Sequence, residues 1–167
     1  MSLVFAFFRN FTIVLKNVKT KHMYPEQMVA PMRQDLTQEG VVELRTAEEV
    51  EQLLSTEKGT VLVVVNSVCG CAAGNARPGV KSAIKNAKIP SHITTVFAGV
   101  DREAVAKARE YMVPFPPSSP SIALFKGGEV VHMLERHHIE GRGAETISAN
   151  LMAVSYTHLT LPTILLV

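Results

Sequence analysis

The most restrictive feature of the chain is a run of β-branched residues that ends just before its only two cysteines. Residues Thr60–Asn66 read Thr-Val-Leu-Val-Val-Val-Asn, which predicts a central strand buried on both faces. A strand of this kind belongs to a sheet that is covered by helices on both sides. The sequence Cys69-Gly70-Cys71 follows where this strand ends and the next helix is expected to begin.

The rest of the chain alternates helices and strands around that run. Further strands are predicted at residues 41–44, 93–100, 121–126 and 129–134, and helices after Pro25, after Thr46, at about 71–87, after Asp101 and at about 144–154. Gly127-Gly128 is a two-residue hairpin turn between the last two strands. The order predicts a mixed sheet with helices on both faces.

Three positions predict how the helices begin or bend. Thr46 and Glu49 have the spacing of a capping box. Asp101 is expected to cap the helix that follows it. Met28, Val29, Met32 and Leu36 form an apolar stripe that ends before Gly40, and Pro31 is expected to start a turn or to kink that helix.

The two cysteines are the candidate catalytic residues. The positive end of a helix stabilises a thiolate and lowers the pKa of a nearby thiol. We therefore expect Cys69, before the helix, to be the more exposed nucleophile, and Cys71 to resolve a mixed disulfide formed at Cys69. Gly70 is expected to let the backbone bend so that the two sulfurs meet. The small Cys-x-Cys ring favours exchange over a structural role.

Two other interpretations of the cysteines stay open. They could be buried, unreactive thiols, or they could bind a metal together with His132, His137 or His138. Cys-x-Cys alone lacks the paired ligand spacing of a structural zinc site. The alternative interpretation of His137-His138 is a solvated hairpin end.

Composition limits the class of protein. The 167 residues suit one domain, and two cysteines are too few for a disulfide scaffold. The net charge is +2, but residues 1–22 hold four basic and no acidic residues, and residues 155–167 have no charged ones. Residues 23–154 therefore carry 13 basic and 15 acidic groups, which predicts no nucleic-acid partner.

The two ends are expected to lie outside the domain. The apolar runs in residues 1–22 are broken by Arg9 and Asn10 and are shorter than a membrane span. We interpret residues 1–22 as a non-native or upstream extension, with Met23 as the natural start. Residues 155–167 end in a bare apolar stretch, which we interpret as a non-native tail.

The segment Ser118–Glu129 resembles the thioredoxin fold, because a proline opens a strand that continues through Phe-Lys and a glycine turn into a hairpin partner. The fold class implied is thioredoxin-like α/β in three layers, with a mixed central sheet flanked by helices and an extra N-terminal helix. The resemblance implies that Pro120 is cis and faces the cysteines. Ser119, Pro120 and Gly70 are the expected substrate contacts.

Several motifs together are similar to the bacilliredoxin family: Met23–Val29, Pro31–Arg33, Asn66–Ala72, Ala76–Pro78 and Pro116–Ser121. The similarity covers residues 23–154. It implies a cytoplasmic thiol–disulfide oxidoreductase that removes bacillithiol from S-bacillithiolated client proteins. Cys69 would attack the mixed disulfide and carry bacillithiol until Cys71 or a second thiol resolves it. Bacillithiol would be a transient partner, and no tightly bound cofactor, metal, nucleic acid or membrane is expected.

Two alternatives to this function are retained. One is a general protein dithiol oxidoreductase or weak disulfide isomerase, and the other is a non-enzymatic thiol redox sensor or metal-binding module. Arg77 has two interpretations as well: a partner for the thiolate or for a bacillithiol carboxylate, or a solvated helix arginine. The sequence predicts no oligomeric state.

Overall fold

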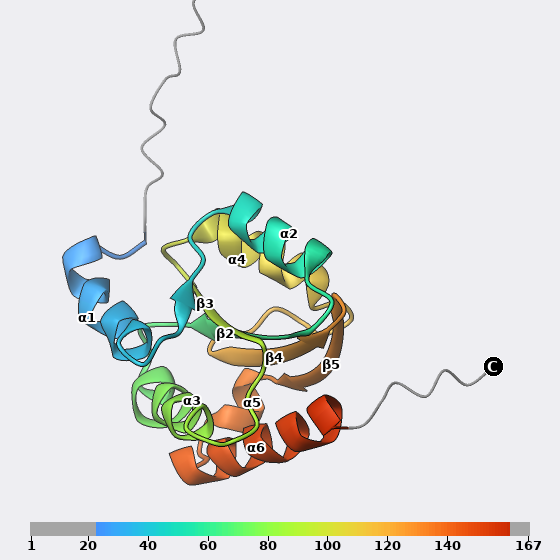
Figure 1. Cartoon of the computed structure of the whole chain (residues 1–167). Helices are drawn as coiled ribbons and strands as arrows, with labels where there is room; N and C mark the ends of the chain where they lie inside the picture. The colour runs from blue at the N-terminus through green and yellow to red at the C-terminus, as the bar shows by residue number, and fades with distance from the viewer. Residues whose placement is uncertain (1–22, 161–167) are drawn as a thin grey trace, which may run out of the picture.

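A mixed five-stranded sheet forms the centre of the structure, a computed structural model that describes residues 23–160 (Figure 1). The residues that we assign to an N-terminal extension, and residues 161–167 of the assigned tail, lie outside the described part. The strands lie in the order β1 (Val42–Glu43), β3 (His92–Phe97), β2 (Thr60–Asn66), β4 (Ser121–Lys126) and β5 (Glu129–Leu134). The mixed sheet that the sequence predicts is confirmed.

The central strand is β2, as its β-branched run predicts. All seven of its residues are buried. It pairs in parallel with β3 on one side and antiparallel with β4 on the other. The bounds of β2, β4 and β5 agree with the prediction, and Gly127 and Gly128 turn the β4–β5 hairpin with φ of 59° and 85°. Both φ values lie in the left-handed region that favours glycine.

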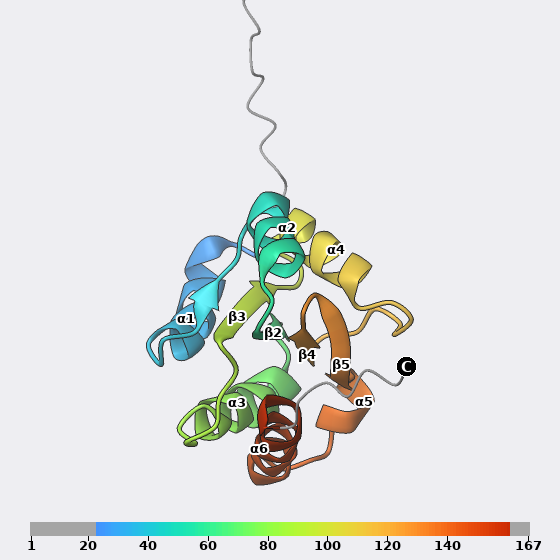
Figure 2. The same cartoon turned by 45° about the vertical axis from the view of Figure 1, so that its right-hand side comes forward.

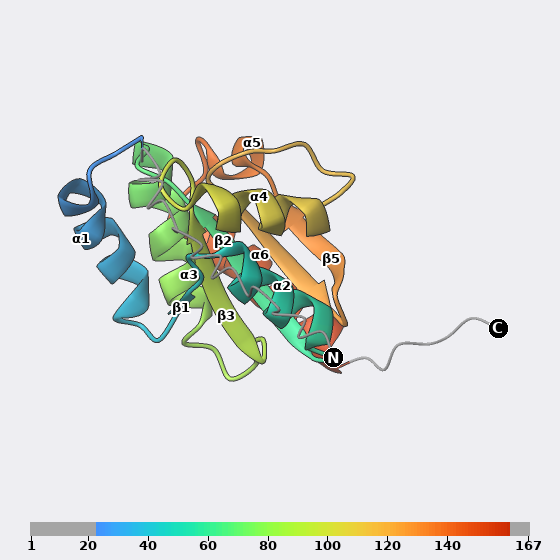
Figure 3. The same cartoon turned by 90° about the horizontal axis from the view of Figure 1, so that it is seen from above.

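Helices cover both faces of the sheet, and one further helix lies at its β1 edge (Figures 2 and 3). The pair α2 and α4 lies on one face and the pair α3 and α6 on the other, while α1 lies beside β1. Their bounds are α1 Glu26–Thr37, α2 Ala47–Thr56, α3 Arg77–Ala83, α4 Arg102–Tyr111 and α6 Ala144–Thr160. The helical layers thus bury both faces of β2.

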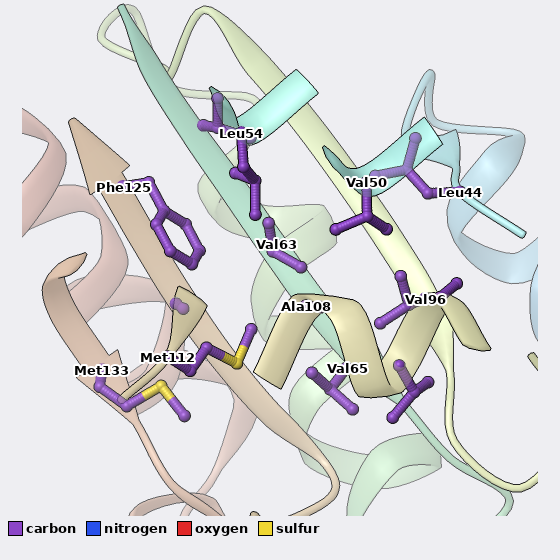
Figure 4. Close-up of a cluster of buried hydrophobic side chains, with 14 residues drawn as sticks. Leu44, Val50, Leu54, Val63, Val65, Val96, Ala108, Met112, Phe125 and Met133 are labelled. Atoms are coloured by element: carbon purple, nitrogen blue, oxygen red, sulfur yellow. The ribbon is translucent and has the colours of Figure 1, made fainter. Parts of the chain in front are cut away.

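Two separate cores follow from the alternation of side chains along β2. Val63 and its alternate neighbours pack under α2 and α4 in a cluster that includes Val50, Ala108 and Phe125 (Figure 4). Val64 faces the opposite way, into a cluster formed by α3, α6 and the other side of the sheet. Because both clusters use β2, the strand before the cysteines is held from two sides.

The first helix continues through Pro31, so the turn that we expected there as one possibility does not form, while the kink stays a prediction. The helix runs unbroken over Glu26–Thr37. Val29 and Leu36 of the predicted stripe are fully buried, but Met28 is exposed.

The loop from β3 to α4 corrects two predictions. The strand ends at Phe97 rather than Val100, because the chain turns at Gly99 with φ of 84°. The side chain of Asp101 makes no cap hydrogen bond with α4. Instead it accepts hydrogen bonds from Nη1 and Nη2 of Arg33 at 2.7 and 2.8 Å. Asp101 therefore fastens α1 to the sheet.

The helical segments near the cysteines and at the C-terminal side also differ from the prediction. The predicted helix 71–87 is a π-helical turn, η1 (Ala72–Ala76), followed by α3, which ends at Ala83. A short helix that the sequence did not predict, α5 (Arg136–Ile139), follows β5. Helix α6 begins at the predicted residue but continues to Thr160, six residues beyond Val154, and buries Ser155.

Candidate active site

The two cysteines lie on the turn between β2 and η1, at the carboxyl end of the central strand. The chain becomes helical at Gly70, and the Ala72 and Ala73 N–H groups donate to the Cys69 carbonyl. Both cysteines are free thiols and both are half-buried. The greater exposure that we expected for Cys69 is therefore not what separates it from Cys71.

Hydrogen-bond donors separate the two thiols. Burial by itself raises the pKa of Cys69, but hydrogen bonds from the Cys71 thiol, the Ser67 hydroxyl and the Ala72 N–H outweigh it and lower that pKa. Ser67 Oγ lies 3.2 Å and Ala72 N 3.3 Å from the Cys69 sulfur. Burial and the neighbouring Cys69 raise the pKa of Cys71. A thiolate is thus favoured at Cys69 and a thiol at Cys71.

Arg77 contacts the residues that precede Cys69 and not the sulfurs. It is 5% exposed, so it is not a solvated helix arginine. Its Nη1 donates to Asn66 Oδ1 at 3.1 Å and to the Ser67 carbonyl at 3.2 Å, and its Nε donates to Asp35 at 2.8 Å. The solvated interpretation of Arg77 is wrong, and the contacts of its side chain position the residues that lead to Cys69, while contact with a bacillithiol carboxylate stays a prediction.

The loop before β4 approaches the same site. The Ser119–Pro120 peptide bond is cis, as the resemblance to the thioredoxin fold implies, and Pro120 is buried. Ser119 and Cys69 line one hollow of about 760 Å³. The Ser119 carbonyl accepts a 3.4 Å hydrogen bond from Arg136 Nη1. The structure therefore brings Ser119 to Cys69, while Pro120 does not line the hollow.

Gly70 is exposed between the two cysteines. It does not have a left-handed φ, so its glycine is not required for the bend that we predicted. Apart from Cys69, Cys71 and the local helix backbone, no atom lies within 4 Å of the place where a Cβ would stand. What Gly70 does provide is an exposed position between the two cysteines, away from the rest of the fold.

Four arginine and serine side chains near Cys69 were not among the predicted site residues. The Ser67 hydroxyl lies 3.2 Å from the Cys69 sulfur, and the positive charge of Arg136 offsets part of the rise in the pKa of Cys71. Arg102 and Arg109 line the hollow from α4. Ser67 could have been found by its position two residues before Cys69, but nothing local in the sequence connects residues 102–136 to the cysteines.

The histidines of the metal interpretation lie elsewhere. Glu135, His137 and His138 form a group on α5 whose possible ligand atoms are within 4.8 Å of one another. His138 Nδ1 already accepts a hydrogen bond from the Glu135 N–H, and His132 contacts Asn150. In the described residues neither cysteine belongs to such a group. The structure does not bring the predicted cysteine–histidine set together.

Comparison with known proteins gives one family. The family described as disulphide isomerase matches residues 24–158. A bacilliredoxin from Cytophaga hutchinsonii is 58% identical over 132 residues, which cover 79% of this chain and 97% of that protein. Bacilliredoxins from Halalkalibacterium halodurans and Bacillus cereus are 54% and 56% identical, and the matches cover 80% and 77% of this chain and 92% and 90% of those proteins.

Solved structures confirm the fold class. The thioredoxin-like domain of an Arabidopsis protein matches with a TM-score of 0.53 at 18% identity, over 76% of this chain and 84% of that one. A thioredoxin from Halobacterium salinarum matches with a TM-score of 0.51 at 17% identity, over 72% and 92%. In residues 23–160, no helix combines the length and the apolar character needed to cross a bilayer.

Proposed function

The chain belongs to the bacilliredoxin family and is a thiol–disulfide oxidoreductase with a thioredoxin-like fold, and on that premise we propose that it removes bacillithiol from S-bacillithiolated proteins. In this proposal Cys69 is the nucleophile, Cys71 is the resolving thiol, and the reaction takes place in the cytoplasm. Bacillithiol is a transient mixed-disulfide partner, and no tightly bound cofactor or metal takes part.

The observation that supports these roles is the difference between the two sulfurs. Hydrogen bonds from Ser67 and Ala72 reach Cys69 and lower its pKa, while the pKa of Cys71 is raised. A thiolate attacks a disulfide and a thiol does not. At neutral pH the attacking group is therefore Cys69, and Cys71 stays protonated until its own step.

The proposed reaction has two thiol exchanges. The Cys69 thiolate attacks the bacillithiol sulfur of the client's mixed disulfide, the old S–S bond breaks, and the client leaves as a thiolate that takes a proton from water. Cys71 then loses its proton and attacks Cys69, which releases bacillithiol and forms a Cys69–Cys71 disulfide. Alternatively, an external thiol displaces bacillithiol and returns Cys69 to the reduced form.

The substrate loop has a supporting part in this scheme. Ser119 lies on the same hollow as Cys69. Pro120 has no N–H, so it makes no backbone donor of its own at this point of the loop. We propose that Ser119, Pro120 and Gly70 border the client polypeptide during the first exchange.

A mass-resolved release assay tests the proposal. A purified client that carries one bacillithiol mixed disulfide is incubated with the full chain, with Cys71→Ser or with Cys69→Ser. Cys71→Ser is expected to release the client thiol and to accumulate a bacillithiol adduct on Cys69, because resolution is blocked. Cys69→Ser is expected to release nothing. Release by Cys69→Ser at the rate of the unchanged chain would show that the assigned roles are wrong.

A second candidate is disulfide isomerisation, which the description of the matching family favours. In that reaction Cys69 attacks a protein disulfide, and a different thiol of the same client resolves the mixed disulfide. The two candidate functions can be distinguished by the substrate that the protein converts faster. Faster reactivation of a scrambled disulfide protein than release of bacillithiol, at equal enzyme concentration, would favour the isomerase.

A further inference from the structure

The hollow beside Cys69 is lined by arginines and by no acidic side chain. Arg102 and Arg109 come from α4 and Arg136 comes from α5, and they share the hollow with Cys69 and Ser119. We call these five residues and the space between them the arginine hollow. Its charge contrasts with that of residues 23–154, which carry two more acidic than basic groups.

Two of the three arginines have no partner within the described residues. Arg102 and Arg109 are seven residues apart on α4, which places them on one side of the helix. Neither side chain makes a hydrogen bond or ion pair with another described residue, and the buried Nε of Arg109 has no partner. Lys107, on the same helix, is paired with Glu51 and Glu110 at 3.2 and 2.7 Å.

Arg109 is also partly buried, which makes a positive charge without a partner more costly. Loss of solvent around its guanidinium lowers the pKa of Arg109, and no carboxylate opposes the change. A partly buried guanidinium is most stable beside a carboxylate, which it can bind with two parallel hydrogen bonds. Arg136 already has such a neighbour in Glu140, at 3.3 Å, and both are exposed to solvent.

We propose that the arginine hollow binds the carboxylates of bacillithiol, with Arg102 and Arg109 as the principal contacts. This inference rests on the proposed function. The volume of the arginine hollow, about 760 Å³, is within the usual range for small-molecule sites. Since Cys69 lines the hollow, the group that enters it is the one that becomes attached to the Cys69 sulfur, and in the proposed reaction that group is bacillithiol.

A comparison of two mixed disulfides on one client tests the inference. One client sample carries bacillithiol and the other carries 2-mercaptoethanol, which has no carboxylate. The second-order rate of client release is measured for the unchanged chain, Arg102→Ala, Arg109→Ala and the control Lys107→Ala. The quantity compared is the ratio of the bacillithiol rate to the 2-mercaptoethanol rate. Arg109→Lys, which keeps the charge, serves as a second variant if Arg109→Ala does not fold.

Arg102→Ala and Arg109→Ala are each expected to lower that ratio about fivefold, the effect of one partly exposed ion pair worth about 1 kcal/mol. Arg109→Lys, which keeps the charge but cannot form two parallel hydrogen bonds, is expected to lower it less. The loss should shrink in high salt, because salt screens exposed charges. Lys107→Ala is expected to leave the ratio within about twofold, since Lys107 does not line the hollow.

Three outcomes would overturn the inference. An unchanged ratio in both Arg102→Ala and Arg109→Ala would show that these arginines do not bind the carboxylates of bacillithiol. An equal loss of rate on both mixed disulfides assigns the arginines to the client polypeptide instead, because the client is the part that the two substrates share. Failure of the unchanged chain to release bacillithiol, with normal release of 2-mercaptoethanol, overturns the proposed function and the arginine hollow's assignment with it.

Discussion

At the scale of single residues, Cys69 and Cys71 differ by the donors around each sulfur. Ser67 Oγ and Ala72 N lie near the Cys69 sulfur at 3.2 and 3.3 Å. Arg77 holds the turn in place through Asn66 and the Ser67 carbonyl. A buried arginine on α3 thus fixes the serine that lowers the pKa of the thiol at the surface.

Removal of the Ser67 hydroxyl is expected to make Cys69 less acidic. The pKa of Cys69 is lower than that of an ordinary cysteine, so its alkylation rate should rise with pH around a midpoint below the ordinary value. Ser67→Ala removes one donor and should move that midpoint to higher pH, with slower alkylation at neutral pH. Iodoacetamide labelling of Cys69, followed by peptide mass spectrometry across a pH series, measures it.

Ser55→Ala is the matched control for this experiment. Ser55 is exposed on α2 and donates to the Glu51 carbonyl, so the midpoint for Cys69 should not move. An unchanged midpoint in Ser67→Ala would mean that the hydroxyl does not support the thiolate.

Candidate site residues could be predicted where the chemistry is local in sequence. Cys69 and Cys71 are candidates because they follow a buried strand and are the only cysteines, and their catalytic roles stay a prediction. Arg77 and Asp101 could not be assigned, because their partners are distant: Arg77 contacts Asp35, and Asp101 contacts Arg33 at a separation of 68 residues. A side chain's partner across the fold is a tertiary property that neither periodicity nor spacing encodes.

At the scale of elements, α1 is fastened to the sheet by the ion pair of Arg33 with Asp101. Both side chains are about 95% buried, at 6% and 5% relative exposure. Burial opposes the charge on Arg33, but the carboxylates of Asp101 and Glu43 raise its pKa above the ordinary value. The helix is therefore held by a buried charge as well as by Val29 and Leu36.

The variant Asp101→Asn distinguishes between two ways in which Asp101 could stabilise the protein, the ion pair with Arg33 and the capping of α4. Asparagine caps a helix as well as aspartate does, so a capping role for Asp101 would leave stability almost unchanged. Loss of the buried pair should instead lower the free energy of unfolding by about 3 kcal/mol. Urea denaturation measures the loss, and hydrogen exchange should show that α1 opens more often.

Thr46→Ala is the comparison variant, because Thr46 does form a capping box with Glu49. It should cost about 1 kcal/mol without added exchange in α1. If Asp101→Asn destabilises the protein less than Thr46→Ala does, the pair with Arg33 is not what holds α1.

Elements with strong patterns had predictable bounds, and elements set by tertiary contacts did not. The β4–β5 hairpin matches its prediction because two glycines separate two apolar runs. Helix α5 was missed because its four residues, Arg136–Ile139, are too short to show a period. The extension of α6 was missed because Ser155, a polar residue, is buried against the rest of the fold.

At the scale of the whole molecule, the two cores share β2 but no helix. Val50 of α2 is fully buried on one face of the sheet, and Val80 of α3 is fully buried on the other. A molecule built in this way can unfold as one unit, because each core depends on the same central strand.

Paired core substitutions test that cooperativity. Val50→Ala and Val80→Ala should each lower the free energy of unfolding by about 2 kcal/mol, from two lost methyl groups and a small cavity. The double variant should lose the sum, in a single transition, because the sites are on opposite faces of the sheet. Urea denaturation followed by circular dichroism measures all three.

Val42→Ala, at a position 57% exposed on β1, should change stability by less than about 0.5 kcal/mol. Two separate transitions in the double variant would show that the cores unfold independently.

The open position of Gly70 gives this fold a site where the reactive centre can be altered independently of the scaffold. Its backbone is helical and not left-handed, and apart from Cys69, Cys71 and the local helix backbone no atom lies within 4 Å of the place where a Cβ would stand. Other residues therefore fit there without disturbing either core, and alanine is favoured over glycine in a helix. A library of substitutions at this one position would let directed evolution retune the exchange chemistry while expression and thermal stability stay nearly constant.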